Sequence, residues 1–277
     1  MRTATRAFWL PALRYYRTVS HALDGFFTTV GEIFILLGQS LWHLCTFTVD
    51  FGEVLKQMSI IGVNAVPVVL LTVTFAGMVL AFYTAQILVE FNMGNYVGMM
   101  AAVTVAREGA PVLSAIVVAA RAGSAIAAEL GSMVVTEQID AMRALAVNPI
   151  QYLVVPRLVS LVLMLPVITM LAIIVGVFGG YLVAAPAGVS SGTFVSSIRR
   201  MGESGLYEVN TGLLKTVFFG AVIALVSCQQ GLKTTGGAAG VGRATTRAVV
   251  LSIVLIYMVD FILVQFLFPN GGSPVKQ

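Results

Sequence analysis

Apolar residues run along this chain in uncharged stretches that are long enough to cross a lipid bilayer. Gln57 to Val89 contains no charged residue, and the same is true of Leu158 to Ile198. A helix needs about 20 mainly apolar residues to span the hydrocarbon core. The pattern predicts an all-α integral membrane protein with five transmembrane helices, which we expect near residues 66–88, 96–120, 158–183, 213–229 and 249–268.

The chain before the first expected span has a different pattern. It begins with a basic segment, and its uncharged part from Ile33 to Val49 is of borderline length for a span. The apolar side chains there recur at the spacing of one helix face, which favours an amphipathic helix lying in the membrane interface. We therefore expect an N-terminal basic segment with an interfacial helix at 1–56, a membrane domain at 57–268 and a polar tail at 269–277.

The basic residues help to decide whether residues 24–56 cross the membrane. If they do not cross and the N-terminus is cytoplasmic, only Arg199, Arg200 and Lys276 lie outside. Most of the other lysines and arginines then lie in cytoplasmic segments, as the positive-inside rule requires. A crossing at 24–56 would remove most of this bias. The sequence therefore predicts five spans and a cytoplasmic N-terminus.

Composition excludes several other classes of protein. The chain is 58% hydrophobic and 10% charged, whereas soluble domains carry about 25% charged residues. Its net charge of +4 is not gathered in an aromatic-studded patch, so we expect no nucleic-acid binding. Cys45 and Cys228 stand alone, which predicts neither a disulfide framework nor a metal site. No catalytic arrangement stands out, and we expect no cofactor in this chain.

Four ionisable residues interrupt the apolar stretches: Arg107, Glu108, Lys215 and Asp260. A charge at the bilayer centre costs about 2.5–3.5 kcal/mol, so such residues usually face a cavity, a partner charge or water at a span end. Pro111 follows the first two and predicts a kink or break, because proline lacks a backbone donor. Two interpretations stay open: structural pairing or snorkelling, and a polar lining for the path of an amphiphile.

A polar island lies between the second and third expected spans, from Glu129 to Pro149. Within it, Glu137, Asp140 and Arg143 follow at three-residue spacing and share one face of a short amphipathic helix. The helix should end at Asn148–Pro149, since the residue before proline disfavours the helical region. The pattern fits a solvated loop helix and a coupling helix seated in a partner's groove about equally well.

A glycine-rich stretch, Gly236 to Arg243, precedes the last expected span and has the sequence GGAAGVGR. It lacks the GK[ST] ending of a phosphate-binding P-loop. We expect a flexible connector here, with the last helix beginning near Ala244. The chain therefore has no ATP-hydrolysing site of its own.

Three of these segments resemble one family of membrane proteins, the MlaE/YrbE permeases. The stretch ARAGSAIAAELGSMVVTEQIDAMRALAVNPIQYLVVPR, Ala120 to Arg157, is similar to the signature of that family. Gly240 to Val250 resembles the family's segment before its last span, and Arg107 to Leu113 resembles its charged break. The likeness runs from roughly Val54 to Phe268, so that the membrane domain is identified as an MlaE-type permease domain.

The resemblance implies the permease subunit of an ABC transporter in an MCE (mammalian cell entry) lipid system. It implies a homodimer of permeases, a dimer of ABC-type ATPases that carries ATP-Mg, and an MCE-domain substrate-binding protein. The cargo would be phospholipid or a related lipid, moved between membranes. Arg107, Glu108, Lys215 and Asp260 match charged positions near the family's lipid cavity. The residues that match its ATPase-coupling region are Glu129, Glu137, Asp140 and Arg143.

We therefore expect a transporter permease, not an enzyme, in a bacterial cytoplasmic membrane or a plastid inner envelope. The alternative is an ion-coupled secondary transporter or channel in which Glu108 and Asp260 bind protons or cations. A purely structural membrane scaffold is a third possibility, and it predicts that removing the charge of Lys215 has no effect on transport.

Overall fold

The structure is a computed structural model that describes residue 25, residues 27–46 and residues 51–267. The described residues form helices and short connections, with no strand among them. In the described part of the chain, five helical segments are long and apolar enough to cross a membrane: Phe51–Glu90, Gly94–Val135, Ile150–Ala184, Ser204–Leu232 and Gly237–Leu267. The prediction of an all-α membrane protein with five spanning helices is confirmed.

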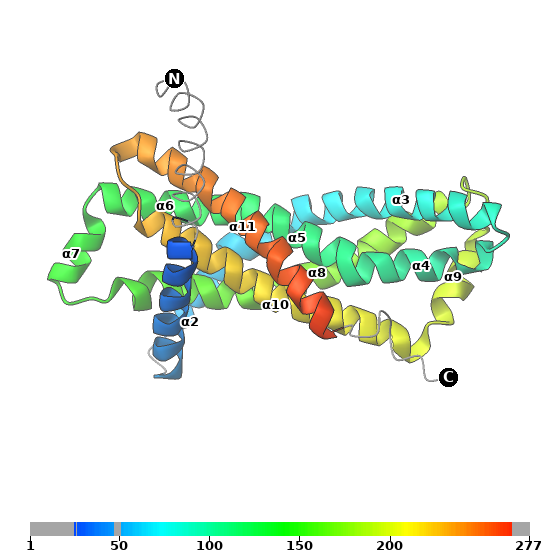
Figure 1. Ribbon diagram of the computed structural model, residues 1–277, viewed down its shortest axis with the longest axis horizontal. Helices are drawn as coiled ribbons and strands as arrows, with labels where there is room; N and C mark the ends of the chain where they lie inside the picture. Colours follow the sequence, from blue (N-terminus) through cyan, green and yellow to red (C-terminus); the bar gives the residue numbers. More distant parts are fainter. Residues whose placement is uncertain (1–24, 26, 47–50, 268–277) are drawn as a thin grey trace, which may run out of the picture.

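These segments lie side by side along the long axis of the molecule (Figure 1). Their α-helices are α2 (Phe51–Gln57), α3 (Val66–Glu90), α4 (Val97–Thr104), α5 (Ala110–Val118), α6 (Ser124–Val135), α8 (Val155–Ala184), α10 (Gly202–Leu232) and α11 (Gly237–Leu267). Two shorter helices lie at opposite ends of the bundle, α7 (Gln138–Ala144) and α9 (Ser191–Arg199).

Glycines let the long helices approach closely. A Cβ atom on Gly77 of α3 would lie 2.2 Å from the carbonyl oxygen of Gly176 in α8, so a side chain at Gly77 would push the two helices apart. A Cβ on Gly180 would lie 2.9 Å from that of Ala81. The small residues of Gly176–Tyr181 therefore serve packing within the chain, because they allow close backbone contact between apolar helices that gain little from hydrophobicity in lipid.

The second spanning segment stays helical throughout, but its backbone hydrogen-bond pattern changes locally. A kink or break was predicted at Pro111, and α4 continues into α5 through a π turn, Val105–Gly109. A proline ring in a regular α-helix clashes with the carbonyl four residues earlier, and the extra residue of a π turn relieves that crowding. The predicted interruption is thus a π turn, and it carries Arg107 and Glu108.

The N-terminal helix, residues 27–45, crosses the bundle near the end that carries α7 (Figure 1). Its Glu32 accepts a hydrogen bond from Gln229 Nε2 at 2.7 Å and pairs with Lys233. His43 Nε2 lies 3.0 Å from Asn148 Nδ2 in the connection after α7. The helix therefore packs against the bundle end, and its location in a membrane interface stays a prediction.

The glycine-rich stretch before the last span is helical, contrary to the flexible connector that its composition predicts. Helix α11 begins at Gly237 instead of near Ala244. Gly236 and Gly237 have φ angles of 87° and 65°, and they lie where the short connection from α10, residues 233–236, enters α11. A Cβ on Gly240 would lie 2.0 Å from the carbonyl oxygen of Thr235. That glycine therefore permits a tight start of the helix.

Candidate functional site

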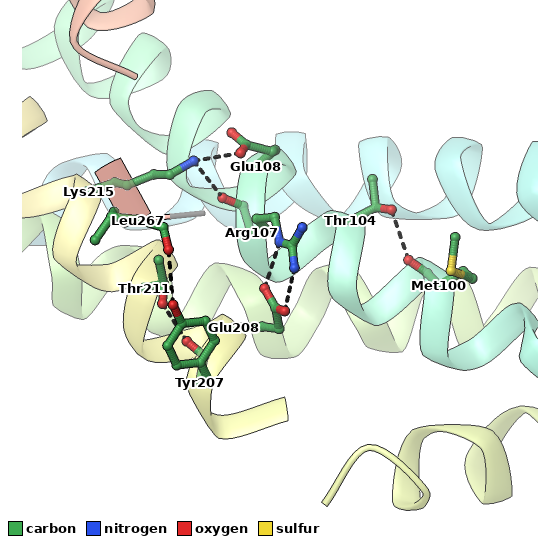
Figure 2. Close-up of polar contacts among 9 residues, drawn as sticks. All are labelled: Met100, Thr104, Arg107, Glu108, Tyr207, Glu208, Thr211, Lys215 and Leu267. Atoms are coloured by element: carbon green, nitrogen blue, oxygen red, sulfur yellow. Dashed lines mark hydrogen bonds and ion pairs between the residues drawn. The ribbon is translucent and has the colours of Figure 1, made fainter. Parts of the chain in front are cut away.

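Three helical segments bring charged side chains together inside the bundle. Figure 2 shows the contacts of Arg107 and Glu108 with Glu208 and Lys215. Arg107 and Glu108 come from the π turn, Lys215 from α10 and Asp260 from α11. The sequence predicted functional importance for these four residues, and the structure places them in one cluster. We call these four residues and Glu208 the charged cluster.

Lys215 is at the centre of one half of the cluster. Its Nζ lies 2.6 Å from Glu108 Oε1 and 3.0 Å from Asp260 Oδ1, and its side chain is completely buried. The contact with Asp260 has the distance of an ion pair without the geometry of a hydrogen bond. A buried ammonium group needs such partners, because a lone charge in an apolar interior is costly.

Lys215 also provides a hydrogen-bond donor for a backbone carbonyl of the π turn. Pro111 has no N–H group to donate to the carbonyl four residues earlier, which is that of Arg107. Lys215 Nζ donates to this same carbonyl at 3.2 Å. The charged side chain therefore ties α10 to the backbone of the irregular turn as well as to its carboxylate.

The other half of the cluster is a two-bond ion pair between Arg107 and Glu208. Arg107 Nε donates to Glu208 Oε2 at 2.7 Å, and Arg107 Nη2 lies 2.5 Å from Oε1. The Glu208 side chain is only 2% exposed. Forked contacts of this kind are among the stronger polar interactions in proteins.

Sequence analysis missed Glu208, because the fourth span was expected to begin at residue 213. Helix α10 extends back to Gly202 and so includes it. Glu208 precedes Lys215 by seven residues, which is two helical turns and places both on one face. The seven-residue spacing of Glu208 and Lys215, which matches the adjacent opposite charges of Arg107 and Glu108, was the signal that could have identified Glu208.

Gly212 sets the distance between α10 and the π turn. A Cβ atom there would lie 2.2 Å from the carbonyl oxygen of Ala106. Gly212 stands between Glu208 and Lys215 on the same helix face, so the absence of a side chain lets both charges reach their partners. The cluster therefore depends on one close backbone approach as well as on its charges.

The cluster opens towards the surface of the chain at Glu108. That side chain is 37% exposed, whereas the side chain of Asp260 is 15% exposed. The cluster contains two cations and three carboxyl groups, so it has one more carboxyl group than it has cations. It can therefore hold a cationic or hydrogen-bonding group that reaches it between the helices.

The residues predicted for coupling are not all in one place. Asp140 and Arg143 form an exposed ion pair on α7, at 3.0 Å. Glu137 lies just before α7 with a φ of 60°, and it makes the sharp turn from α6. Ile139 of α7 is buried, whereas Leu145, which directly follows α7, is 76% exposed. One side of this helix is thus anchored and the other is open to a partner.

Glu129 lies apart from these residues and makes a different contact. Its Oε1 lies 2.9 Å from Nη2 of Arg157, which joins α6 to α8 below α7. Arg157 is buried, and its Nη1 also donates to the carbonyl of Leu153 at 2.6 Å. Glu129 and Arg157 therefore close the base of the hairpin whose tip is α7. Sequence analysis did not anticipate this pair.

The fold and the charged cluster define a multi-pass α-helical membrane protein with a polar centre. The family model described as Permease MlaE matches residues 54–266. The chain therefore belongs to the MlaE permease family, and it is a transporter permease and not an enzyme.

Curated proteins of three kinds of organism are similar to it. A probable ABC transporter permease protein of Synechocystis is 38% identical over 91% of this chain and 96% of its own length. The chloroplastic protein TRIGALACTOSYLDIACYLGLYCEROL 1 of Arabidopsis thaliana is 37% identical over 87% of this chain and 69% of its own. The intermembrane phospholipid transport system permease protein MlaE of Haemophilus influenzae is 33% identical over 89% of this chain and 94% of its own length.

Proposed function

We propose that this chain is the permease subunit of an ABC transporter that moves phospholipid or a related lipid between membranes. ATP-Mg would be bound and hydrolysed by a separate ATPase. The observation that carries the proposal is the charged cluster, which lies inside the helical bundle of a chain of the MlaE permease family. The name of the Haemophilus relative supports phospholipid as the cargo.

The cluster and its surroundings suit an amphiphile. Glu108 is the most exposed carboxylate of the cluster and would meet a lipid headgroup that enters between the helices. Helix α11 presents large apolar side chains such as Tyr257, Phe261 and Ile262 next to Asp260 in sequence, and all three are exposed. Acyl chains would lie along such a surface, while the polar headgroup reaches Glu108 and Arg107 at its edge.

The transporter would contain two copies of this chain, a dimer of ABC-type ATPases and an MCE-domain protein. The part of α11 around Tyr257 and Phe261 is the best candidate for the contact between copies, because these large side chains are exposed on the single chain. Two such faces would enclose a shared lipid cavity between the two clusters.

Helix α7 would couple the ATPase to the membrane helices. Leu145 and the Asp140–Arg143 pair offer an apolar and a charged contact on its open side. Movement of α7 would pass directly into α6 and α8, because Glu129 and Arg157 hold their ends together. Closure of the ATPases would in this way change the spacing of the helices that carry the cluster.

The end of the bundle with α7 would face the cytoplasm, together with the N-terminal helix. The exposed basic residues of this end include Arg143, Lys233, Arg243 and Arg247. Only Arg199 and Arg200 are exposed basic residues of α9 and the turn after it at the other end. The positive-inside rule supports this orientation. The membrane would be a bacterial cytoplasmic membrane or, given the chloroplastic relative, a plastid inner envelope.

Reconstitution would test this function directly. The chain, its ATPase and its MCE-domain protein would be placed in donor vesicles, and transfer of a fluorescent phospholipid to acceptor vesicles would be measured with and without ATP. E108Q should lower ATP-dependent transfer. E90Q, which changes an exposed glutamate at the C-terminal end of α3, should not. Equal transfer by E108Q and the wild type would contradict a role for the cluster.

The surplus carboxyl group favours ion-coupled transport as a second candidate. Glu108 and Asp260 flank one ammonium group, and such a site can exchange a proton. In this case, lipid or ion movement by the isolated chain would follow a pH gradient and would not need ATP. Transfer that requires both ATP and the ATPase would exclude it.

A further inference from the structure

A second polar feature lies at the α7 end of the bundle, beneath the N-terminal helix. An open cavity of about 260 Å³ lies between this helix and the adjoining ends of α10 and α11. Lys233 at its wall follows Lys215 by 18 residues, so the cavity lies about 27 Å along α10 from the charged cluster. The residues that give it its character are Thr29, Gln229, Gln230, Lys233, Arg243 and Arg247.

The charge in this cavity is strongly positive. Lys233 pairs with Glu32, but the described residues place no carboxylate within ion-pair distance of Arg243 or Arg247. Arg243 Nη2 is 3.5 Å from the carbonyl oxygen of Thr235, at the limit of a hydrogen bond. Two guanidinium groups beside amide and hydroxyl side chains match an anion such as phosphate, which arginine binds through its planar fork.

An apolar groove adjoins the cavity. It has a volume of about 500 Å³, and its floor is formed by Val250, Leu251 and Val254 of α11. Thr29, Gln230 and Arg247 line both spaces. A polar basic cavity and an apolar groove therefore share one wall, an arrangement that fits a molecule with an anionic head and a hydrocarbon chain.

We propose that an anionic phospholipid of the surrounding bilayer binds at this site. Its phosphate would lie between Arg243 and Arg247, and one acyl chain would follow α11 past Val250 and Val254. The groove favours a lipid over free phosphate, because the phosphate ion would leave the apolar part empty. The proposal does not depend on transport by the chain, since the site is remote from the charged cluster.

The lipid would hold the N-terminal helix against the bundle. Thr29 lines the cavity from the N-terminal helix, and Glu32, one turn later, already joins the same helix to Lys233 and Gln229. An anionic headgroup would add a contact on the other side of Thr29. Basic residues at the bilayer surface attract anionic lipids in this way.

Native mass spectrometry of the detergent-solubilised full chain would test the proposal with phosphatidylglycerol and phosphatidylcholine. The doubly substituted R243Q/R247Q chain should bind phosphatidylglycerol roughly 30-fold more weakly, as expected for two basic residues at an anionic surface. Its binding of phosphatidylcholine should fall by less, because the choline ammonium group offsets the charge of that lipid's phosphate. The matched control is R199Q/R200Q, which removes two exposed arginines at the other end and should retain phosphatidylglycerol.

A second variant tests the shape of the site without changing its charge. T29W would fill the wall between cavity and groove and should also weaken phosphatidylglycerol binding. Unchanged binding in T29W and R243Q/R247Q would overturn the proposal, as would equal loss in R199Q/R200Q. Full displacement of the lipid by millimolar inorganic phosphate would identify a free-anion site instead. If R243Q/R247Q keeps the lipid and no longer captures the ATPase, the arginines bind that protein and the proposal is wrong.

Discussion

At the scale of single residues, the charged cluster explains why a membrane protein keeps ionisable groups inside its helices. Each cation meets a carboxylate on another helix: Lys215 meets Glu108 and Asp260, and Arg107 meets Glu208. Such pairs do not need to add stability, because desolvation of both partners opposes their attraction. Their consequence is asymmetric, since the loss of one partner leaves the other buried without compensation.

Lys215 gives the clearest test of that asymmetry. K215M should destabilise the chain by about 3–5 kcal/mol, because Glu108 and Asp260 would then face each other without a cation. Unfolding followed in detergent with a denaturant would measure it. K215M/D260N should recover part of the loss, since one of the two carboxylates is removed. A single K215M chain as stable as the wild type would show that the cluster is not tightly coupled.

The pair of Arg107 and Glu208 should show direct coupling. In a double-mutant cycle of R107Q, E208Q and the combined variant, we expect a coupling energy of about 1–3 kcal/mol, as for residues in one ion-pair network. The same unfolding measurement gives all four values. Additive losses would mean that the forked contact contributes no energy of its own.

At the scale of elements, the sequence predicted the helices well and their irregularities poorly. Hydrophobic stretches show where a chain can span a bilayer, so the five apolar segments were recognisable from composition alone. The π turn before Pro111, and a helix that begins at Gly237, depend on neighbours that the sequence does not place. Glu208 was missed for the same reason, because only packing showed how far α10 extends.

Gly212 and Gly242 form a matched pair of helical glycines with opposite expectations. G212A should destabilise the chain and disturb the cluster, because its Cβ would lie 2.2 Å from the carbonyl oxygen of Ala106. G242A should stabilise it by about 0.5–1 kcal/mol, because no atom lies within 4 Å of its Cβ and alanine favours a helix. Thermal unfolding would compare them. Equal effects would show that α10 can move away without cost.

The contact of the N-terminal helix with the bundle should depend on pH. Hydrogen bonds from Lys233 and Gln229 hold the pKa of Glu32 below its usual value. A depressed pKa means that the contact is present above the ordinary pKa of a glutamate and is lost as the pH falls through the lowered value. The protection of residues 27–45 against hydrogen exchange, expressed relative to the intrinsic exchange rate at each pH, should therefore be high at pH 7 and lower at strongly acidic pH. E32Q should exchange faster at pH 7 and lose most of this pH dependence.

At the scale of the whole molecule, the two ends of the bundle have different chemistry. One end gathers α7, the N-terminal helix and the basic cavity, while the other carries α9 and few basic residues. From the sequence, only the positive-inside rule could place these features on the same side of the membrane. The contacts of Glu32 with α10 and of His43 with Asn148 now hold them together physically. The contacts place these features at one end of the bundle, and the positive-inside rule gives the side of the membrane that we expect this end to face.

Accessibility labelling would decide that orientation. In a C45S background, D140C on α7 should react with a membrane-impermeant maleimide only after the cells are opened, whereas S196C on α9 should react in intact cells. The other cysteine, Cys228, is buried and should stay silent. An odd number of spans lies between the N-terminal helix and α9 in this arrangement, and an even number between that helix and α7. Labelling of D140C from outside would place the coupling helix beyond the reach of a cytoplasmic ATPase, and the proposed mechanism would fail with it.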